Sequence, residues 1–370
     1  MKLLKLLIVL LCLGYSVSAQ EEPLTPPGIL STGDVLVATS DYPLDLRNIT
    51  QLWLLDPFIV GKQQKLYLNI EREGYRVHDI EIARGGQYLL TLEIEGREDT
   101  GFVPLGKSEL VRMNLETGQR EAMFTGVNLV NFSLSPNAEQ ALIRFYPEEM
   151  TFVDRYDLLL REQWCVVTLR PNQGECRDLT FAEETYPRAF EWVSDDVLAY
   201  TLNYQDSIQI LDTTTFTTAV IELPEGRHAN EIRPILNTAN LLVYDAPLQG
   251  EVGKLLLLDV PHRSFSEIGN LNYAPMSIME ISPDGNSLVM AGGNIGVLVN
   301  LQTGKIIQTY PTIYDMEWSS FQWLPTDHML FLIGNLGFKG GNVMTVLFEP
   351  NFNVAVNIFT QLNGKLVIVP

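Results

Sequence analysis

The stretch that decides the fold runs from Ile278 to Tyr310 and reads IMEI-SPDGNS-LVMA-GGNI-GVLVNL-QTGK-IIQTY. Short apolar runs alternate in it with turn residues. Asp284-Gly285 and Thr303-Gly304 stand where tight hairpin turns belong, because glycine readily adopts the positive φ angles that such turns need. The stretch therefore predicts a meander of four antiparallel strands.

The same pattern recurs along most of the chain. Apolar segments that end in a polar residue equivalent to Asn300 follow one another at about 49 residues, and four-stranded propeller blades repeat every 40–50 residues or so. The seven segments are Leu52–Asp56, Leu110–Asn114, Trp164–Thr168, Ile208–Asp212, Leu255–Asp259, Gly296–Asn300 and Thr345–Glu349. A turn sequence followed by an apolar run precedes six of these segments in the same phase. The alternative is an accidental spacing of turns in another kind of β protein.

The first repeat has only three predicted strands, at 34–39, 51–56 and 65–70. The apolar run Lys365–Val369 at the far end of the chain can supply the fourth. A ring must pair its first and last blades, because open sheet edges are otherwise left exposed. We therefore predict an all-β fold, a seven-bladed β-propeller of four-stranded antiparallel blades in which the C-terminal strand closes the ring.

One part of this pattern resembles a known group of proteins. Ser282-Pro283-Asp284-Gly285, an apolar strand and then Asn300-Leu301 before Thr303-Gly304 resemble the WD40 and TolB-like β-propellers. The resemblance covers roughly Gly33 to Pro370, and it is specific only around the quoted stretch. No repeat carries the Gly-His and Trp-Asp pairs of WD40 blades. The resemblance implies a fold and a habit of binding other molecules, and it does not imply an activity.

The N-terminus is typical of a secretory signal peptide. Lys2 and Lys5 precede the apolar run Leu6–Leu13, and Val17-Ser18-Ala19 resembles a cleavage site. A retained membrane anchor is the alternative, but the apolar run is shorter than the ~20 residues that a span needs. We expect an exported protein, periplasmic or extracellular, with no membrane span after cleavage. The predicted organisation is a signal peptide at 1–19, a flexible linker at 20–32 and the propeller at 33–370.

Composition limits the possible partners. The formal net charge of −20 repels nucleic acid and anionic lipid surfaces, so neither is expected as a partner. The same charge would tolerate cationic partners or divalent ions, although a merely solvated acidic surface is the simpler interpretation. Hydrophobic residues make up 46% of the chain, which is enough to bury a core in every repeat. A disordered chain is therefore not expected.

The two cysteines outside the leader predict a disulfide. Cys165 and Cys176 flank a turn from Arg170 to Gly174 and would face each other on a hairpin, within disulfide reach. Free buried thiols are the alternative, and the exported context favours the bond.

The sequence motifs give little support for a catalytic, cofactor or metal site. Gly101 to Ser108 fits the phosphate-binding pattern G-x-x-x-x-G-K-[ST], but no apolar strand precedes it and a strand follows it where a helix is required. The histidines are scattered without metal-ligand spacing, and there is no G-x-S-x-G nucleophile elbow. We predict no cofactor, no metal site and no catalytic residue. Of the glycosylation sequons at Asn48 and Asn131, the second falls in a predicted inner strand and is the poorer candidate.

The long connections between second and third strands belong to the first three blades, at Ser40–Thr50, Glu95–Ser108 and Tyr146–Gln163. They carry aromatic, arginine and acidic residues, and such residues on loops are typical binding anchors. The predicted binding residues are Tyr42, Arg97, Asp99, Phe102, Asp154, Arg155 and Tyr156. We expect a monomeric scaffold or binding module for a protein or glycan partner, and not an enzyme. The alternative is a glycosidase or lyase that uses carboxylates near the central channel, drawn from Glu148, Glu149, Asp154 or Asp99.

Overall fold

The computed structural model describes most of the region predicted to fold. The described residues are 28–31, 34–39, 49–55, 65–70, 72–83, 85–95, 106–147, 161–171, 174–182, 185–203, 205–235, 238–245, 253–271, 278–292, 295–311, 316–323, 330–336, 343–349, 354–359 and 364–368. Every named element among them is a β-strand, which confirms the predicted all-β class. A search of these residues for a helix that is long and apolar enough to span a bilayer finds none.

The strands form four-stranded antiparallel sheets, seven in the described part of the chain. The first joins β28 (Gly364–Ile368) to β1 (Val35–Thr39), β2 (Gln51–Leu55) and β3 (Lys65–Asn69). The second contains β4 (Tyr75–Ile82), β5 (Tyr88–Glu95), β6 (Lys107–Asn114) and β7 (Arg120–Val127), and the third contains β8 (Leu129–Leu134), β9 (Gln140–Phe145), β10 (Gln163–Thr168) and β11 (Cys176–Leu179). The fourth contains β12 (Pro187–Ser194), β13 (Val197–Leu202), β14 (Ser207–Asp212) and β15 (Thr217–Glu222).

The remaining sheets continue the same order. The fifth contains β16 (Ala229–Pro234), β17 (Asn240–Asp245), β18 (Gly253–Asp259) and β19 (Ser264–Leu271). The sixth contains β20 (Ile278–Ile281), β21 (Ser287–Gly292), β22 (Ile295–Asn300) and β23 (Lys305–Pro311). The seventh contains β24 (Met316–Trp323), β25 (Leu330–Leu336), β26 (Val343–Glu349) and β27 (Val354–Phe359).

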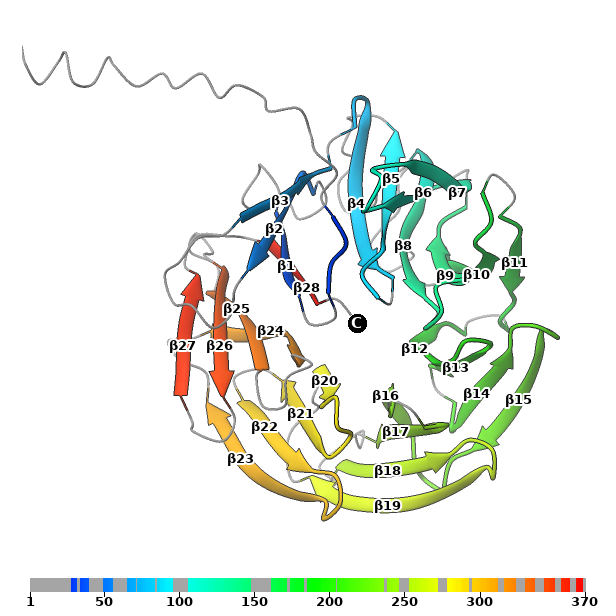
Figure 1. Cartoon of the computed structure of the whole chain (residues 1–370). Helices are drawn as coiled ribbons and strands as arrows, with labels where there is room; N and C mark the ends of the chain where they lie inside the picture. Colours follow the sequence, from blue (N-terminus) through cyan, green and yellow to red (C-terminus); the bar gives the residue numbers. More distant parts are fainter. Residues whose placement is uncertain are drawn as a thin grey trace, which may run out of the picture.

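The sheets stand around a common centre (Figure 1). The innermost strands of the seven sheets are β28, β4, β8, β12, β16, β20 and β24. The C-terminal strand β28 is the inner strand of the first sheet, antiparallel to β1, with Val35 opposite Ile368 and Thr39 opposite Gly364. This is the pairing predicted for the run 365–369. The seven apolar segments of the repeat each fall on the third strand of a sheet, as predicted.

The polar residue that closes each segment has a clear structural role in several sheets. The Oδ1 atom of Asn300 accepts hydrogen bonds from the backbone N–H and the hydroxyl of Thr303, at 2.9 and 3.0 Å. Asn114, Asp212 and Asp259 accept backbone N–H groups of the following turn in the same way. Short polar side chains favour such turns because they satisfy backbone donors locally. Gly304 completes the turn at φ 64°, and a Cβ there would lie 2.0 Å from the carbonyl oxygen of Ile268.

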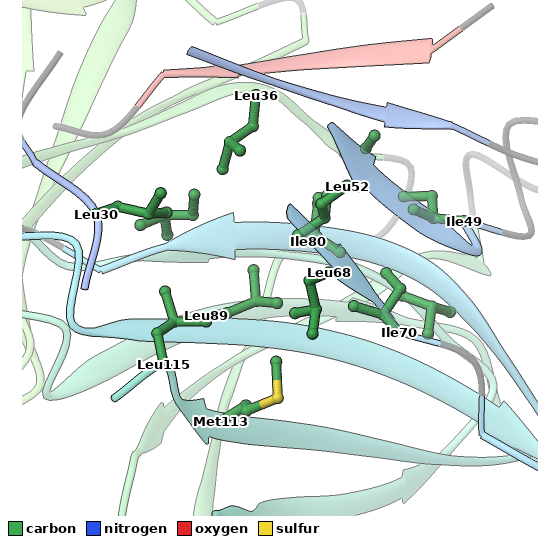
Figure 2. Close-up of a cluster of buried hydrophobic side chains, with 13 residues drawn as sticks. Leu30, Leu36, Ile49, Leu52, Leu68, Ile70, Ile80, Leu89, Met113 and Leu115 are labelled. Atoms are coloured by element: carbon green, nitrogen blue, oxygen red, sulfur yellow. The ribbon is translucent and has the colours of Figure 1, made fainter. Parts of the chain in front are cut away.

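The core consists of apolar layers between neighbouring sheets. Figure 2 shows the layer between the first two sheets, where Leu36 and Leu52 pack with Leu89 and other buried side chains. The next residue of β5, Leu90, belongs to the layer between the second and third sheets. Successive residues of the strand are therefore buried on opposite faces, which explains why the sequence runs apolar without alternation.

Side chains of the inner strands also bridge neighbouring sheets by hydrogen bonds. Indole N–H groups are the donors at two junctions, from Trp192 to Ser133 of β8 and from Trp323 to the carbonyl oxygen of Glu280 on β20. At another junction Glu81 of β4 accepts the backbone N–H of Leu134 at 2.9 Å. These bridges satisfy polar groups beside the centre of the disc and tie consecutive sheets together.

The predicted disulfide is present within the third sheet. Cys165 on β10 and Cys176 on β11 are bonded, with their Cα atoms 5.6 Å apart. One detail differs from the prediction, because Cys176 lies opposite Val167 and Cys165 lies opposite Asp178. The bond therefore runs diagonally between positions two residues apart in register. Such neighbours are still close on a twisted pair of strands.

Candidate binding face

The predicted binding residues belong to three connections between second and third strands. These connections join β1 to β2, β5 to β6 and β9 to β10. All seven residues lie outside the described residues, namely Tyr42, Arg97, Asp99, Phe102, Asp154, Arg155 and Tyr156. Glu148 and Glu149, the other carboxylates considered for catalysis, lie outside them as well. The strand ends that begin and end each connection are described, and they show how the connections are held.

The first connection ends beside the second sheet. The backbone N–H of Ile49 donates to the carbonyl oxygen of Val77 on β4 at 2.8 Å, and the N–H of Ile70 donates to the carbonyl oxygen of Thr50 at 2.9 Å. Ile49 is buried, so its backbone hydrogen bond is shielded from water. The end of the first connection is thereby fixed to the inner strand of the next sheet.

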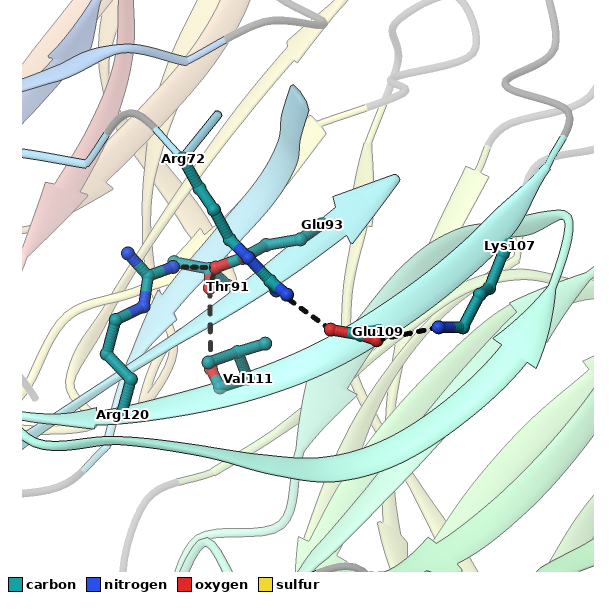
Figure 3. Close-up of polar contacts among 7 residues, drawn as sticks. All are labelled: Arg72, Thr91, Glu93, Lys107, Glu109, Val111 and Arg120. Atoms are coloured by element: carbon teal, nitrogen blue, oxygen red, sulfur yellow. Dashed lines mark hydrogen bonds and ion pairs between the residues drawn. The ribbon is translucent and has the colours of Figure 1, made fainter. Parts of the chain in front are cut away.

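The second connection is held by a network of charged side chains (Figure 3). Its centre is Glu93 on β5, whose side chain is 0% exposed and is paired with both Arg72 and Arg120. Arg72 comes from the link between the first two sheets and also donates to Glu109 at 2.8 Å, while Lys107 lies 3.2 Å from Glu109. A buried carboxylate needs such partners, because an unpaired charge in the interior is very costly.

Electrostatic interactions in this network keep Arg72 and Glu109 charged. Burial opposes the charge of Arg72, but hydrogen bonds to Glu93 and Glu109 outweigh it and raise the pKa of the guanidinium further. Burial likewise favours neutral Glu109, and hydrogen bonds from Arg72 and Lys107 reverse this and lower its pKa. The guanidinium of Arg72 also lies 3.7 Å from the centre of the Tyr75 ring. The network is a fixed structural support at the ends of β5 and β6.

Asn128 joins the second connection to the third. Its side chain accepts the N–H of Gly106 at 2.9 Å and donates to the carbonyl oxygen of Pro147 at 2.9 Å. Its backbone N–H donates to the carbonyl oxygen of Gly106, and its own carbonyl oxygen accepts the N–H of Tyr146. Asn128 is buried and has a φ of 55°, a left-handed conformation that asparagine tolerates better than most residues. One residue thus fixes the end of one connection to the start of the next.

The third connection begins and ends beside a partly buried polar group. Glu162 accepts hydrogen bonds from Arg144 at 3.2 Å and from the hydroxyl of Tyr146 at 3.1 Å. Burial raises the pKa of Glu162, and the positive charge of Arg144 limits the rise. Burial and the neighbouring Glu162 raise the pKa of Tyr146 to about 12, so its hydroxyl stays protonated and can donate. We call the surface above these three supported ends, with the connections themselves, the loop face.

A second group of ionisable residues lies on inner strands beside the centre of the disc. Glu191 on β12, Glu231 and Arg233 on β16, and Glu280 on β20 make up what we call the axial cluster. Nη1 of Arg233 donates to Glu191 at 2.6 Å, and its Nε donates to the carbonyl oxygen of Met279 at 2.8 Å. The side chains of Arg233, Glu191 and Glu231 are 22–25% exposed, so solvent reaches them.

Three carboxyl groups around one guanidinium cannot all be neutralised by it. Burial raises the pKa of Glu191 to about 7, although Arg233 opposes the rise. Burial raises the pKa of Glu280 to about 7 as well, and it also raises that of Glu231. Carboxyl groups that titrate near neutral pH can accept or donate protons there, which is a property of many active sites.

The structure offers little support for nucleotide or metal binding among the residues it describes. Lys107 and Ser108, the end of the phosphate-binding pattern, begin strand β6 and not a helix. His262 lies 2.9 Å from Asp259, and His228 is paired with Asp206. One group of potential metal ligands is found in this part of the chain, Cys165, Cys176 and Asp178, but its two sulfur atoms are bonded to each other.

Sequence reasoning missed Asn128, Arg72 and the axial cluster. Asn128 follows β7 in the position of an ordinary turn residue, and nothing local distinguishes it. The axial cluster did have a usable signal, because charged residues appear in the phase of inner strands at Glu191, Arg233 and Glu280.

No protein-family model and no curated protein sequence matches the chain. Solved β-propeller structures do resemble it. The Myceliophteria thermophila Cps50 (Swd1) β-propeller domain has a TM-score of 0.56 at 13% identity, over 83% of this chain and 92% of that one. An oligogalacturonate lyase in complex with manganese has a TM-score of 0.58 at 12% identity, over 82% and 91% of the two chains.

A structure from a study of two prolyl endopeptidases gives a TM-score of 0.58 at 10% identity, over 92% of this chain and 51% of that one. These identities are low enough that the likeness shows the β-propeller fold alone. The comparison with these solved structures also corrects one prediction. The prediction that the protein is not an enzyme is contradicted, because solved proteins that share this fold include a lyase and an endopeptidase, although identities of 10–12% establish no activity for this chain.

Proposed function

We propose that the protein is an exported propeller of the WD40 and TolB-like type that binds a protein or glycan partner through the loop face. In this proposal the seven sheets are the blades of one closed ring, and β28 completes the first blade. The observation that carries the proposal is that three long connections from consecutive sheets have fixed ends. Asn128 joins the second connection to the third, and the pair Ile49 and Val77 fixes the first to the second sheet.

Fixed ends favour binding because they reduce the entropy lost when a partner orders the surface. The buried network around Glu93 serves the same purpose, since its partners come from the link between sheets as well as from β6 and β7. On this support Arg97, Phe102 and Arg155 are the proposed anchors. Residues of these types contribute most in measured interfaces, often ~2 kcal/mol or more each.

The supporting evidence for export is the disulfide, which suits an oxidising compartment. We propose a periplasmic or extracellular protein that acts as a monomer toward its partner. Its acidic surface, with a formal net charge of −20, favours partners that are neutral or basic.

The proposal is tested by capturing a partner from the exported fraction with the purified full chain. Alanine variants at Arg97, Phe102 and Arg155 should lose the partner. Matched variants at Asn137, Asp195 and Asp284, in turns at the opposite ends of the sheets, should retain it. Loss of binding in the turn variants, with the loop variants unaffected, would place the site on the other face.

A second candidate function is catalysis at the axial cluster. The observation that favours it is the pair of carboxyl groups of Glu191 on β12 and Glu280 on β20, on the two sides of Arg233 on β16, whose pKa values are raised to about 7. A carboxylate with such a pKa can act as general base at neutral pH, and Arg233 can orient an anionic substrate. Cleavage of oligogalacturonate is a sensible first assay, with E191Q and E280Q as variants. Absence of turnover, or turnover unchanged in both variants, would count against this candidate.

A further inference from the structure

The outer strands of the sheets differ in how they protect their free edges. Among the described strands, five outer strands carry an extra residue that the register leaves unpaired. These residues are Tyr67 on β3, Met123 on β7, Ile268 on β19, Ile307 on β23 and Ile358 on β27. Such β-bulges twist an edge and hinder the addition of another strand, which is a common protection of exposed sheet edges.

The two outer strands without a bulge belong to consecutive sheets. The first, β11, is only four residues long and is bonded to β10 by the disulfide, and short strands are poor templates. The second, β15, pairs with β14 over all six residues from Thr217 to Glu222 without any irregularity. In the described part of the chain, β15 is therefore the outer strand that is both regular and long enough to pair again.

The sequence of β15 has few of the other protections, because its one charged residue is Glu222 at the end of the strand. It reads TTAVIE, with no lysine, arginine or proline, and its β-branched residues favour extended structure. Ile221 is buried against the fifth sheet, whereas the alternate residues Thr218, Val220 and Glu222 are exposed. Val220 is 49% exposed, one of few large apolar side chains so exposed among the described residues.

The register also shows which backbone groups are free for a new strand. The N–H of Leu223 donates to the carbonyl oxygen of Asp206, so these two residues form a hydrogen-bonded pair beside Ser207 and Glu222. Hydrogen-bonded pairs alternate along an antiparallel ladder, so Thr217, Ala219 and Ile221 bond inward to β14. The N–H and C=O groups of Thr218, Val220 and Glu222 consequently point away from the sheet.

We propose that β15 is a docking site for an extended, basic segment of a partner protein, which adds to the fourth sheet as a fifth strand. Strand addition takes its affinity from backbone hydrogen bonds and its specificity from alternate side chains. Glu222 on the strand and Glu225 just beyond it are exposed, so basic residues of the partner find opposite charges there. A second copy of this chain is a poorer occupant, because two molecules of net charge −20 repel each other.

The proposal is independent of the loop face and is tested on the full chain with synthetic probes. The first probe is a labelled, end-capped hexapeptide of alternating lysine and valine. The second has the same sequence with N-methylated valines, which keeps the charge and removes half of the backbone donors. The third has glutamate in place of lysine. Binding is followed by fluorescence anisotropy at physiological salt.

The key variant is Val220→Pro, which removes an outward-pointing N–H and leaves the inward hydrogen bonds of β15 intact. Its matched control is Ile307→Pro, at an exposed, unpaired bulge residue of β23. We expect the basic peptide to bind, and V220P and the N-methylated peptide each to weaken binding roughly tenfold or more, as for loss of one or two hydrogen bonds. I307P should bind like the unaltered chain.

Several results would overturn the proposal. One is absence of binding by the basic peptide. Another is equal binding of the basic peptide and its N-methylated form, which would mean that charge alone is responsible. This comparison uses the unaltered chain, so it remains decisive if V220P fails to fold. Dimerisation of the unaltered chain that V220P abolishes, measured by light scattering, would assign the edge to a second copy.

Discussion

Replacing Asn128 should loosen the loop face and destabilise the whole chain. Asn128→Ala removes the acceptor for the N–H of Gly106 and the donor for the carbonyl oxygen of Pro147. Alanine is also strained at a φ of 55°, because it has a Cβ but lacks the polar side chain that lets asparagine adopt this conformation. Asn128→Gly removes the same two hydrogen bonds and fits the left-handed conformation without strain.

The expected loss in the free energy of unfolding is the sum of the lost hydrogen bonds and the backbone strain. Two hydrogen bonds contribute about 1 kcal/mol each, and the partly buried N–H of Gly106, left without its acceptor, adds up to about 2 kcal/mol. N128G should therefore cost about 2–4 kcal/mol of the free energy of unfolding. The left-handed conformation costs alanine about 1–2 kcal/mol, and the larger unfolded-state entropy of glycine offsets part of this difference. N128A should be less stable than N128G by up to about 1 kcal/mol.

Denaturant unfolding of the two variants measures the energies, and hydrogen exchange of the Gly106 amide measures the local effect. That amide should exchange faster in both variants, whereas the Tyr146 amide, which donates to the backbone of residue 128, should keep more of its protection. A loss below about 0.5 kcal/mol with unchanged protection at Gly106 would refute the role of Asn128 as the link between the two connections.

Three further outcomes follow from the structure. Because the folded pKa of Glu280 is raised from 4.5 to about 7, its protonated form stabilises the fold at low pH, and this contribution is lost as the pH rises from about 4.5 to 7. The stability of the unaltered chain relative to E280Q should fall over that range in urea melts, and a constant difference would contradict the assignment. Replacing both Cys165 and Cys176 by alanine should cost about 3 kcal/mol, measured by urea unfolding with thiol labelling as the check on the bond. Deleting residues 364–370 removes the partner of β1, so a calorimetric scan should show a broad or split transition, and an unchanged single transition would argue against closure by β28.

The repeat could be predicted from the sequence because its markers are local. Turn glycines such as Gly304 and closing residues such as Asn300 act on neighbours within a few positions, so their spacing reports the strands directly. The pairing of the chain ends was also accessible, since a three-stranded first repeat and a spare C-terminal run require each other. Most of the fold could therefore be predicted from the sequence.

The contacts that support the candidate site are of another kind. Asn128 joins residues 22 and 19 positions away, and Arg233 reaches Glu191 across 42 positions. Such pairs depend on how sheets turn relative to each other, which no local pattern records. The open edge of β15 is likewise visible only by comparing its register with those of the other outer strands. The loop residues named from the sequence remain predictions.

The loop-face proposal is tested most directly by hydrogen exchange of the full chain with and without a partner captured from the exported fraction. The account predicts slower exchange in the three connections and at their ends, including Ile49, Gly106 and Tyr146, with no change in the turns at Asn137 and Asp284. Protection confined to those turns, or to β15 alone, would contradict it.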